Sequence, residues 1–273
     1  MNGIARVISV TSGKGGVGKT TMTVNLAVCL ARAGKSVLLL DADLGLANVD
    51  VMLGLAPHHT LNDVLEGRKN LGEILVSGPE GISIIPAASG VEEMGSLDTA
   101  KRMILMQEIE EIAHKFDYLL IDTSAGIGAD VLYFNSASSE IVVVINDEPT
   151  SLTDAYALIK VLSQNYGEKS FSVLVNEVAD AKTAITAFNR LNSAVERFLH
   201  VELRNLGFIP QDSAAAEAVR NQKALVEIYP SSPAALAFAA LARKLDAEFY
   251  DLRVKGGMQF FFKQLLELSA HGN

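Results

Sequence analysis

The stretch TSGKGGVGKTT at 11–21 places two lysines five residues apart among small residues. It follows an apolar, strand-like run at 4–10 and precedes a helical pattern at 19–33. Glycines let several backbone N–H groups point at one spot, and a helix N-terminus adds the positive end of its dipole, so this context suits a phosphate group. The residues from 13 to 20 match G-x-x-x-x-G-K-[ST], which places Lys19 at the β- and γ-phosphates and the Thr20 hydroxyl at Mg²⁺. The motif leaves the other lysine, Lys14, without a role. The predicted nucleotide-binding residues of this loop are Gly13, Lys14, Gly15, Gly16, Val17, Gly18, Lys19, Thr20 and Thr21.

The same loop also satisfies G-x-G-x-x-G, the fingerprint of dinucleotide sites, and Asp41 ends the next strand where a ribose-binding acid is expected. Two features favour a nucleoside triphosphate instead. Lys19 and Thr20 would have no function in a dinucleotide site. Asp122 ends a second acid-terminated strand, YLLIDTSAG, which P-loop enzymes use to support magnesium.

Composition narrows the class of protein further. The chain has 273 residues, 49% of them hydrophobic, and a formal net charge of −9, which argues against a surface coated for nucleic acid. The N-terminus does not resemble a signal peptide, and no apolar run approaches the ~20 residues of a membrane-spanning helix. The lone Cys29 cannot form an internal disulfide. We expect a cytoplasmic protein.

Strand-like and helical patterns alternate along nearly the whole chain, and most strand candidates are continuous apolar runs such as SVLLLD and EIVVVIN. Such runs are typical of parallel sheets covered on both faces. The sequence therefore predicts an α/β protein with a single doubly wound, mostly parallel sheet flanked by helices, at 1–250. A linker at 251–257 and a C-terminal helix and tail at 258–273 follow. The predicted strands are 4–10, 36–41, 82–85, 117–122, 140–146, 171–176 and 205–209. The predicted helices are 19–33, 99–115, 129–137, 151–165, 181–199, 213–222 and 232–249.

In an open parallel sheet the ligand lies beyond the carboxyl ends of the strands. The residues that follow those ends are Asp41, Asp43, Asp122, Asn176, Pro210 and Asp212. An amide at such an end can make paired hydrogen bonds to the edge of a base. For Asn176 and Asp212, ordinary turn chemistry remains an equal alternative, because Asn and Asp favour such positions.

The C-terminal stretch 258–268, MQFFFKQLLEL, forms an amphipathic helical wheel with a single phenylalanine, Phe260, on its polar side. Its apolar side includes Met258, Phe261, Phe262, Leu265 and Leu266. This helix could lie on a membrane surface, or it could dock on its own domain or in a dimer groove. Lys263 is its sole cation and Glu267 offsets it, so attraction to anionic lipid should be weak.

The loop KGGVGKTT resembles the deviant P-loop of the MinD/ParA family of dimeric ATPases, and the resemblance covers roughly 4–250. Within that family the chain looks most like the FleN/FlhG group of flagellar-number regulators. The stretches that carry this likeness are LLDADLGLANVDVMLGL, IIPAASG, IDTSAGIG, NDEPTSLTDAYALIK and GGMQFFFKQLLE. Partition ATPases typically show D-x-D-P-Q-G where this chain has DADLGL.

The resemblance implies a role for each charged residue of the site. Lys14 corresponds to the signature lysine that crosses to the phosphates of the other subunit in an ATP-bound, face-to-face dimer. Asp43 would orient or activate the attacking water. Thr20 would bind Mg²⁺, and Asp41 and Asp122 would support that ion. The implied activity is slow hydrolysis of ATP to ADP and phosphate, as suits a switch.

The resemblance also implies partners: a homodimer with ATP, a monomer with ADP or without nucleotide, and a flagellar transcription activator that is restrained according to nucleotide state. It places the chain in the cytoplasm, reversibly associated with the inner membrane through the C-terminal helix, without sequence-specific DNA binding. A signal-recognition-type flagellar GTPase is a further implied partner, although Met1 to Gly3 do not match the extension with which some members stimulate it. The alternative is a division-site or cargo-positioning ATPase that acts on membrane or nucleoid. An iron–sulfur carrier of related fold is disfavoured because the chain has no C-x-x-C pair.

Overall fold

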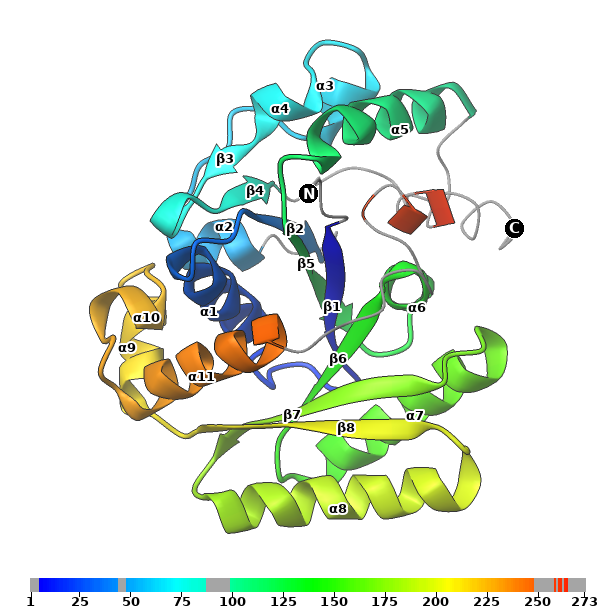
Figure 1. Ribbon diagram of the computed structural model, residues 1–273, viewed down its shortest axis with the longest axis vertical. Helices are drawn as coiled ribbons and strands as arrows, with labels where there is room; N and C mark the ends of the chain where they lie inside the picture. The colour runs from blue at the N-terminus through cyan, green and yellow to red at the C-terminus, as the bar shows by residue number, and fades with distance from the viewer. Residues whose placement is uncertain are drawn as a thin grey trace.

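The computed structural model describes residues 5–43, 48–86, 99–247, 258, 260, 261, 263 and 264. Their centre is an 8-stranded sheet with the order β3-β4-β2-β5-β1-β6-β7-β8 (Figure 1). The strands are β1 (Arg6–Ser12), β2 (Val37–Ala42), β3 (Val76–Ser77), β4 (Ser83–Ile85), β5 (Tyr118–Ala125), β6 (Glu140–Ile145), β7 (Ser170–Val178) and β8 (Glu202–Pro210). All neighbours pair in parallel except β3 and β4, which are antiparallel. The predicted doubly wound, mostly parallel sheet is confirmed.

Helices cover both faces of this sheet. They are α1 (Lys19–Arg32), α2 (Asn48–Leu53), α3 (Leu61–Leu65), α4 (Leu71–Ile74), η1 (Pro79–Gly81), α5 (Thr99–Ala113), α6 (Ala129–Ala137), α7 (Pro149–Asn165), α8 (Ala181–Phe198), α9 (Ser213–Arg220), α10 (Leu225–Ile228) and α11 (Pro233–Ala247). One face packs against α1, α2, α9, α10 and α11, and the other against α3 to α8. The apolar run of β2 shows why its pattern is continuous: Leu39 belongs to the first layer, whereas Leu38 and Leu40 belong to the second.

The chain order places the candidate site at the centre of the sheet. β1 lies between β5 and β6 (Figure 1). The strands β2 to β5 lie on one side of β1, and the later strands β6 to β8 lie on the other. Parallel pairing brings the carboxyl ends of these strands to one edge. In the register of β2 with β5, Asp41 is the direct partner of Asp122. Both acids therefore lie at the edge where the sequence predicts the ligand site.

Strand and helix positions agree with the predicted ranges, but several elements were missed. The missed elements are β3, η1, α2, α3, α4 and α10. β1 and β5 also continue beyond their apolar runs, to Ser12 and Ala125, because the backbone pairing persists into polar residues.

The described part of the C-terminal helix is docked on the domain. Met258 is 2% exposed and Phe261 is fully buried, and both belong to the core layer that covers β2 and β5. Phe261 stacks on Phe134 of α6 with ring centroids 6.2 Å apart. Phe260 is 46% exposed, as its position on the polar side of the wheel predicts. The other predicted membrane-facing residues, Phe262, Leu265 and Leu266, and the linker at 251–257 lie outside the described residues.

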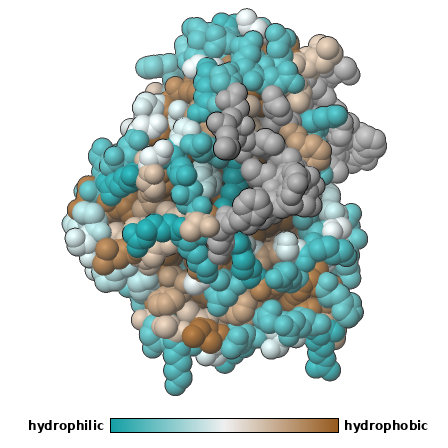
Figure 2. All heavy atoms as spheres, viewed as in Figure 1, coloured by the Kyte–Doolittle hydropathy of each residue, from teal (hydrophilic) through white to brown (hydrophobic). Residues whose placement is uncertain are grey.

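Within the described ranges, no helix has the length and apolarity needed to cross a bilayer. On the face seen in Figure 2, hydrophobic residues form separate patches among hydrophilic ones.

Candidate functional site

The glycine loop joins β1 to α1 and ends at a helix N-terminus that no side chain caps. Gly16 and Gly18 have φ of 77° and 85°, a left-handed conformation that glycine adopts without steric cost. Gly15 and Gly16 are exposed at the crest of the loop. Gly18 is the N-cap of α1 and no side chain caps the helix, whose first turn has no acidic residue. This loop can therefore receive an anion.

Contacts from two other elements hold the loop in place. A Cβ atom on Gly13 would clash with the backbone of Asp154 in α7, so only glycine fits there. The side chain of Val17 is buried, and its carbonyl accepts a 2.8 Å hydrogen bond from Asn176 Nδ2 at the end of β7. Asn176 was predicted to contact a base edge. The structure shows that one N–H of its amide already holds the loop.

Lys19 lies beneath the loop and is 9% exposed. Its Nζ donates a 2.9 Å hydrogen bond to Ser12 Oγ. Burial lowers the pKa of Lys19, while the carboxylates of Asp122 and Asp43 oppose that shift. A buried ammonium at the start of α1 is suited to bind a phosphate oxygen as a point charge.

Thr20 and Asp122, two of the three residues predicted to support magnesium, lie in direct contact. Thr20 Oγ1 donates to Asp122 Oδ2 at 2.6 Å, and Thr23 Oγ1 lies 3.3 Å from Oδ1. Asp122 is 1% exposed, and burial raises its pKa to about 7 against the hydrogen bond from Thr20. In the described part of the chain, no three Asp, Glu, His or Cys side chains are grouped to hold a metal alone. The hard oxygen donors fit Mg²⁺, which usually takes one or two carboxylates and completes its shell with phosphate and water.

Asp41 supports the loop after β2. Its carboxylate accepts backbone hydrogen bonds of 3.0–3.1 Å from Asp43, Asn48 and Val49 at the start of α2. Burial raises the pKa of Asp41 to about 6 against those bonds. Asp43 Oδ2 accepts a 2.9 Å bond from Asn48 Nδ2. Asp41 therefore ties Asp43 to the start of α2.

Lys14 has a partner that sequence reasoning missed. Its Nζ forms an ion pair with Glu148 and donates a 3.0 Å hydrogen bond to Thr150 Oγ1, both at the start of α7. The side chain of Lys14 is 32% exposed and that of Glu148 is 53% exposed, so the pair lies at the surface. Lys14 is thus held against the start of α7. The only indication in the sequence that this helix takes part in the site was the stretch NDEPTS, which resembles the flagellar regulators.

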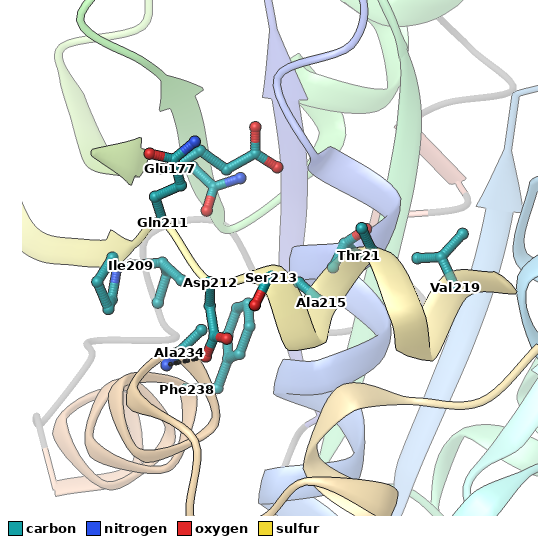
Figure 3. Close-up of a pocket in the computed structure, with 13 residues that line it drawn as sticks. Thr21, Glu177, Ile209, Gln211, Asp212, Ser213, Ala215, Val219, Ala234 and Phe238 are labelled. Atoms are coloured by element: carbon teal, nitrogen blue, oxygen red, sulfur yellow. Dashed lines mark hydrogen bonds between the residues drawn. The ribbon is translucent and has the colours of Figure 1, made fainter. Parts of the chain in front are cut away.

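A pocket of about 420 Å³ extends from α1 to α9 and α11 (Figure 3). Three residues predicted to contact the nucleotide line it, Asn176, Pro210 and Asp212, together with Thr21 of the loop. Its apolar walls are Ile209, Ala215, Ala216, Val219, Ala234 and Phe238. A pocket with apolar walls and a few polar groups suits a flat nucleobase, whose edges are polar.

Asp212 has a structural task in this pocket. Its Oδ1 caps α9 through Ala214 N at 3.0 Å, and its Oδ2 accepts from Ala234 N of α11 at 3.1 Å. Asp212 therefore has the turn-stabilising role that was the alternative to nucleotide contact, and both of its carboxylate oxygens accept hydrogen bonds. Phe238, inside α11, and Gln211, just after β8, also line the pocket and were missed, because neither residue type at such a position signals a ligand.

Comparison with known proteins agrees with this geometry. The family model described as "AAA domain" matches residues 5–174. The antiactivator FleN of Pseudomonas aeruginosa is 46% identical over 268 residues, which covers 98% of this chain and 96% of FleN. The flagellum site-determining protein YlxH of Helicobacter pylori is 35% identical and covers 97% of this chain and 91% of its own.

Solved structures point to the same family. MinD in the MinC:MinD cell division complex of Aquifex aeolicus aligns with a TM-score of 0.70 at 32% identity, over 90% of this chain and 97% of that chain. MinD of Pyrococcus horikoshii, solved with Mg-ADP, aligns with a TM-score of 0.69 at 28% identity, over 89% and 97% of the two chains. With the deviant P-loop, the paired acids of β2 and β5 and these relatives, the chain belongs to the MinD/ParA family of P-loop ATPases.

Proposed function

We propose that this chain is an ATP-driven dimerising switch that regulates flagellar number by restraining a flagellar transcription activator. The observation that carries the switch is the separation of the two lysines. Lys19 is buried under the loop, whereas Lys14 is at the surface and paired with Glu148 of α7. Similarity to FleN and YlxH supports the flagellar role.

Within one subunit, Lys19 and the N–H groups of the loop bind the β- and γ-phosphates. Thr20 and Asp122 are the residues that would hold Mg²⁺, since their oxygens lie 2.6 Å apart. When bound, this ion neutralises charge on the phosphate oxygens. Asn176 keeps the loop in position through Val17, and the pocket beside Thr21 accepts adenine.

Across the dimer, Lys14 supplies a second positive charge to the partner's phosphates. It must first exchange its Glu148 ion pair for that contact, which links hydrolysis to dimerisation in the manner of an arginine finger. Asp43, which Asp41 ties to the start of α2, orients the attacking water. Orientation and charge stabilisation supply most of the catalysis of phosphoryl transfer, so Asp43 can act without removing a proton from the water.

The C-terminal helix makes membrane association conditional. With Met258 and Phe261 buried against the domain, these side chains cannot reach lipid in the docked arrangement. We propose that the ATP-bound dimer releases the helix, and that two released helices bind the membrane together at high effective concentration.

A deletion strain tests the flagellar role. We expect cells without this gene to carry more flagella than the wild type. Complementation with the wild-type gene should restore the number, and a Lys19→Ala gene should not. The MinD relatives, such as that of Synechocystis at 33% identity, support division-site placement as the alternative. Unchanged flagellar number with displaced division septa would replace the proposed role by that alternative.

A further inference from the structure

Glu177 adopts an unusual backbone conformation at the edge of the base pocket. It follows Asn176 near the end of β7, and its φ is 56°. The pairing with β8 shifts register here, since Val175 pairs with Phe208 and Val178 with Pro210. Such bulges redirect a side chain, and non-glycine residues with positive φ cluster at ligand sites. The conformation therefore points to a task for the Glu177 side chain.

The side chain lies between the phosphate loop and the base pocket. Glu177 lines the pocket, and its Oε1 lies 3.4 Å from the position that a Cβ atom on Gly18 would take. Figure 3 shows Glu177 at the end of the pocket opposite Val219. Among the residues that the structure describes, no cation or hydrogen-bond donor engages its carboxylate.

Two other polar side chains of the pocket already make structural hydrogen bonds. Asn176 Nδ2 bonds to the loop, and both oxygens of Asp212 accept backbone N–H groups. Glu177 is therefore the charged acceptor that remains available to a ligand here.

The position of a bound nucleotide determines which of its groups lies next to the Glu177 carboxylate. If the triphosphate occupies the loop and the base occupies the pocket beside Ile209 and Phe238, the sugar must lie between them, over Gly18. A carboxylate repels phosphate but accepts hydrogen bonds from vicinal hydroxyls, as the ribose-binding acids of dinucleotide sites do. We propose that Glu177 is a specificity-determining residue that recognises the 2′- and 3′-hydroxyls of the ribose. This inference rests on the proposed ATP binding.

Titration of the full-length protein with Mg²⁺ and ATP, 2′-deoxy-ATP, 3′-deoxy-ATP or GTP tests it. We expect the wild type to bind ATP at least about tenfold more tightly than either deoxy analogue, because hydrogen bonds to charged groups discriminate strongly. Glu177→Gln and Glu177→Gly should reduce this ratio to about twofold or less and leave the ratio of ATP to GTP unchanged. Glu202→Gln is the matched control, an exposed acid at the opposite end of β8, and should keep the wild-type ratio.

The same set of variants includes a control for loss of folding. Glycine relieves a left-handed conformation, so Glu177→Gly should melt at the same or a higher temperature than the wild type. Equal affinity of the wild type for ATP and both deoxy analogues, or undiminished discrimination in the Glu177 variants, would overturn the inference alone. A changed ratio of ATP to GTP would assign Glu177 to the base and overturn it too. A wild type that binds no ATP would refute the proposed function, and the inference with it.

Discussion

If the C-terminal helix binds lipid when released, Phe134→Leu should increase membrane binding without altering that helix. Phe134 is 1% exposed in α6 and stacks on Phe261 of the docked helix. Full burial of Phe261 and Met258 stabilises docking by about 1.5–3 kcal/mol for each side chain. The ring pair adds about 0.5–1.5 kcal/mol, which leucine removes while nearly filling the space. The released population should therefore rise about two- to twelvefold.

Sedimentation with anionic vesicles measures this population. In ADP, where the wild type should sediment weakly, Phe134→Leu should sediment more strongly. Phe261→Ala weakens docking as well, but it should lose lipid binding because the helix itself is damaged. Lys263→Ala and added salt should change little, since the attraction is mainly apolar. Equal sedimentation of Phe134→Leu and the wild type in ADP would refute competition between the domain and lipid for the helix.

The remaining predictions concern the nucleotide site. Asp43→Ala should retain binding of a non-hydrolysable ATP analogue in a titration but abolish turnover and trap the dimer, so loss of binding would contradict its role. Lys19→Ala should weaken both ATP and ADP, whereas Lys14→Ala should spare ADP and prevent dimerisation with ATP analogue in size-exclusion chromatography. A Lys14→Ala protein that dimerises and hydrolyses normally would remove the proposed contact in trans. Burial raises the pKa of Asp122 from 3.8 to about 7, so the protonated carboxyl fits the nucleotide-free fold better. Its stabilising contribution is complete below pH 3.8 and lost as pH rises through about 7, so the metal-free melting temperature should fall over that range. Asp122→Asn should flatten this fall, and an identical pH profile for the two proteins would contradict the raised pKa.

The sheet and the phosphate loop were predictable because their signals are local. Continuous apolar runs identify buried strands, and the spacing of glycine, lysine and threonine identifies the loop. Asp41 and Asp122 were predicted to lie at the same edge of the sheet, but only the strand order shows that they are direct partners. By contrast, α3, α4 and α10 contain only four or five residues each, which is too short for a helical period to appear.

Long-range contacts were not predictable. The Lys14–Glu148 pair joins residues 134 positions apart, and the Asn176–Val17 bond joins residues 159 apart. Sequence placed these polar residues near the same edge, but loop geometry decides which donor meets which acceptor. The C-terminal helix shows the same limit, because an apolar face that buries Phe261 suits protein and lipid equally well.

A mixing experiment tests most directly whether Lys14 acts across an ATP-bound dimer. Lys14→Ala and Asp43→Ala chains should each be inactive alone. In a mixture, the site of a Lys14→Ala chain keeps its own Asp43 and receives Lys14 from its Asp43→Ala partner. Random pairing of equimolar chains would make about one site in four complete. Because Asp43→Ala chains also trap one another in inactive dimers, the mixture should regain activity up to, and not beyond, about a quarter of the wild-type ATPase rate. A mixture as inactive as its two components would show that Lys14 serves its own subunit, and would contradict the switch proposed for this protein.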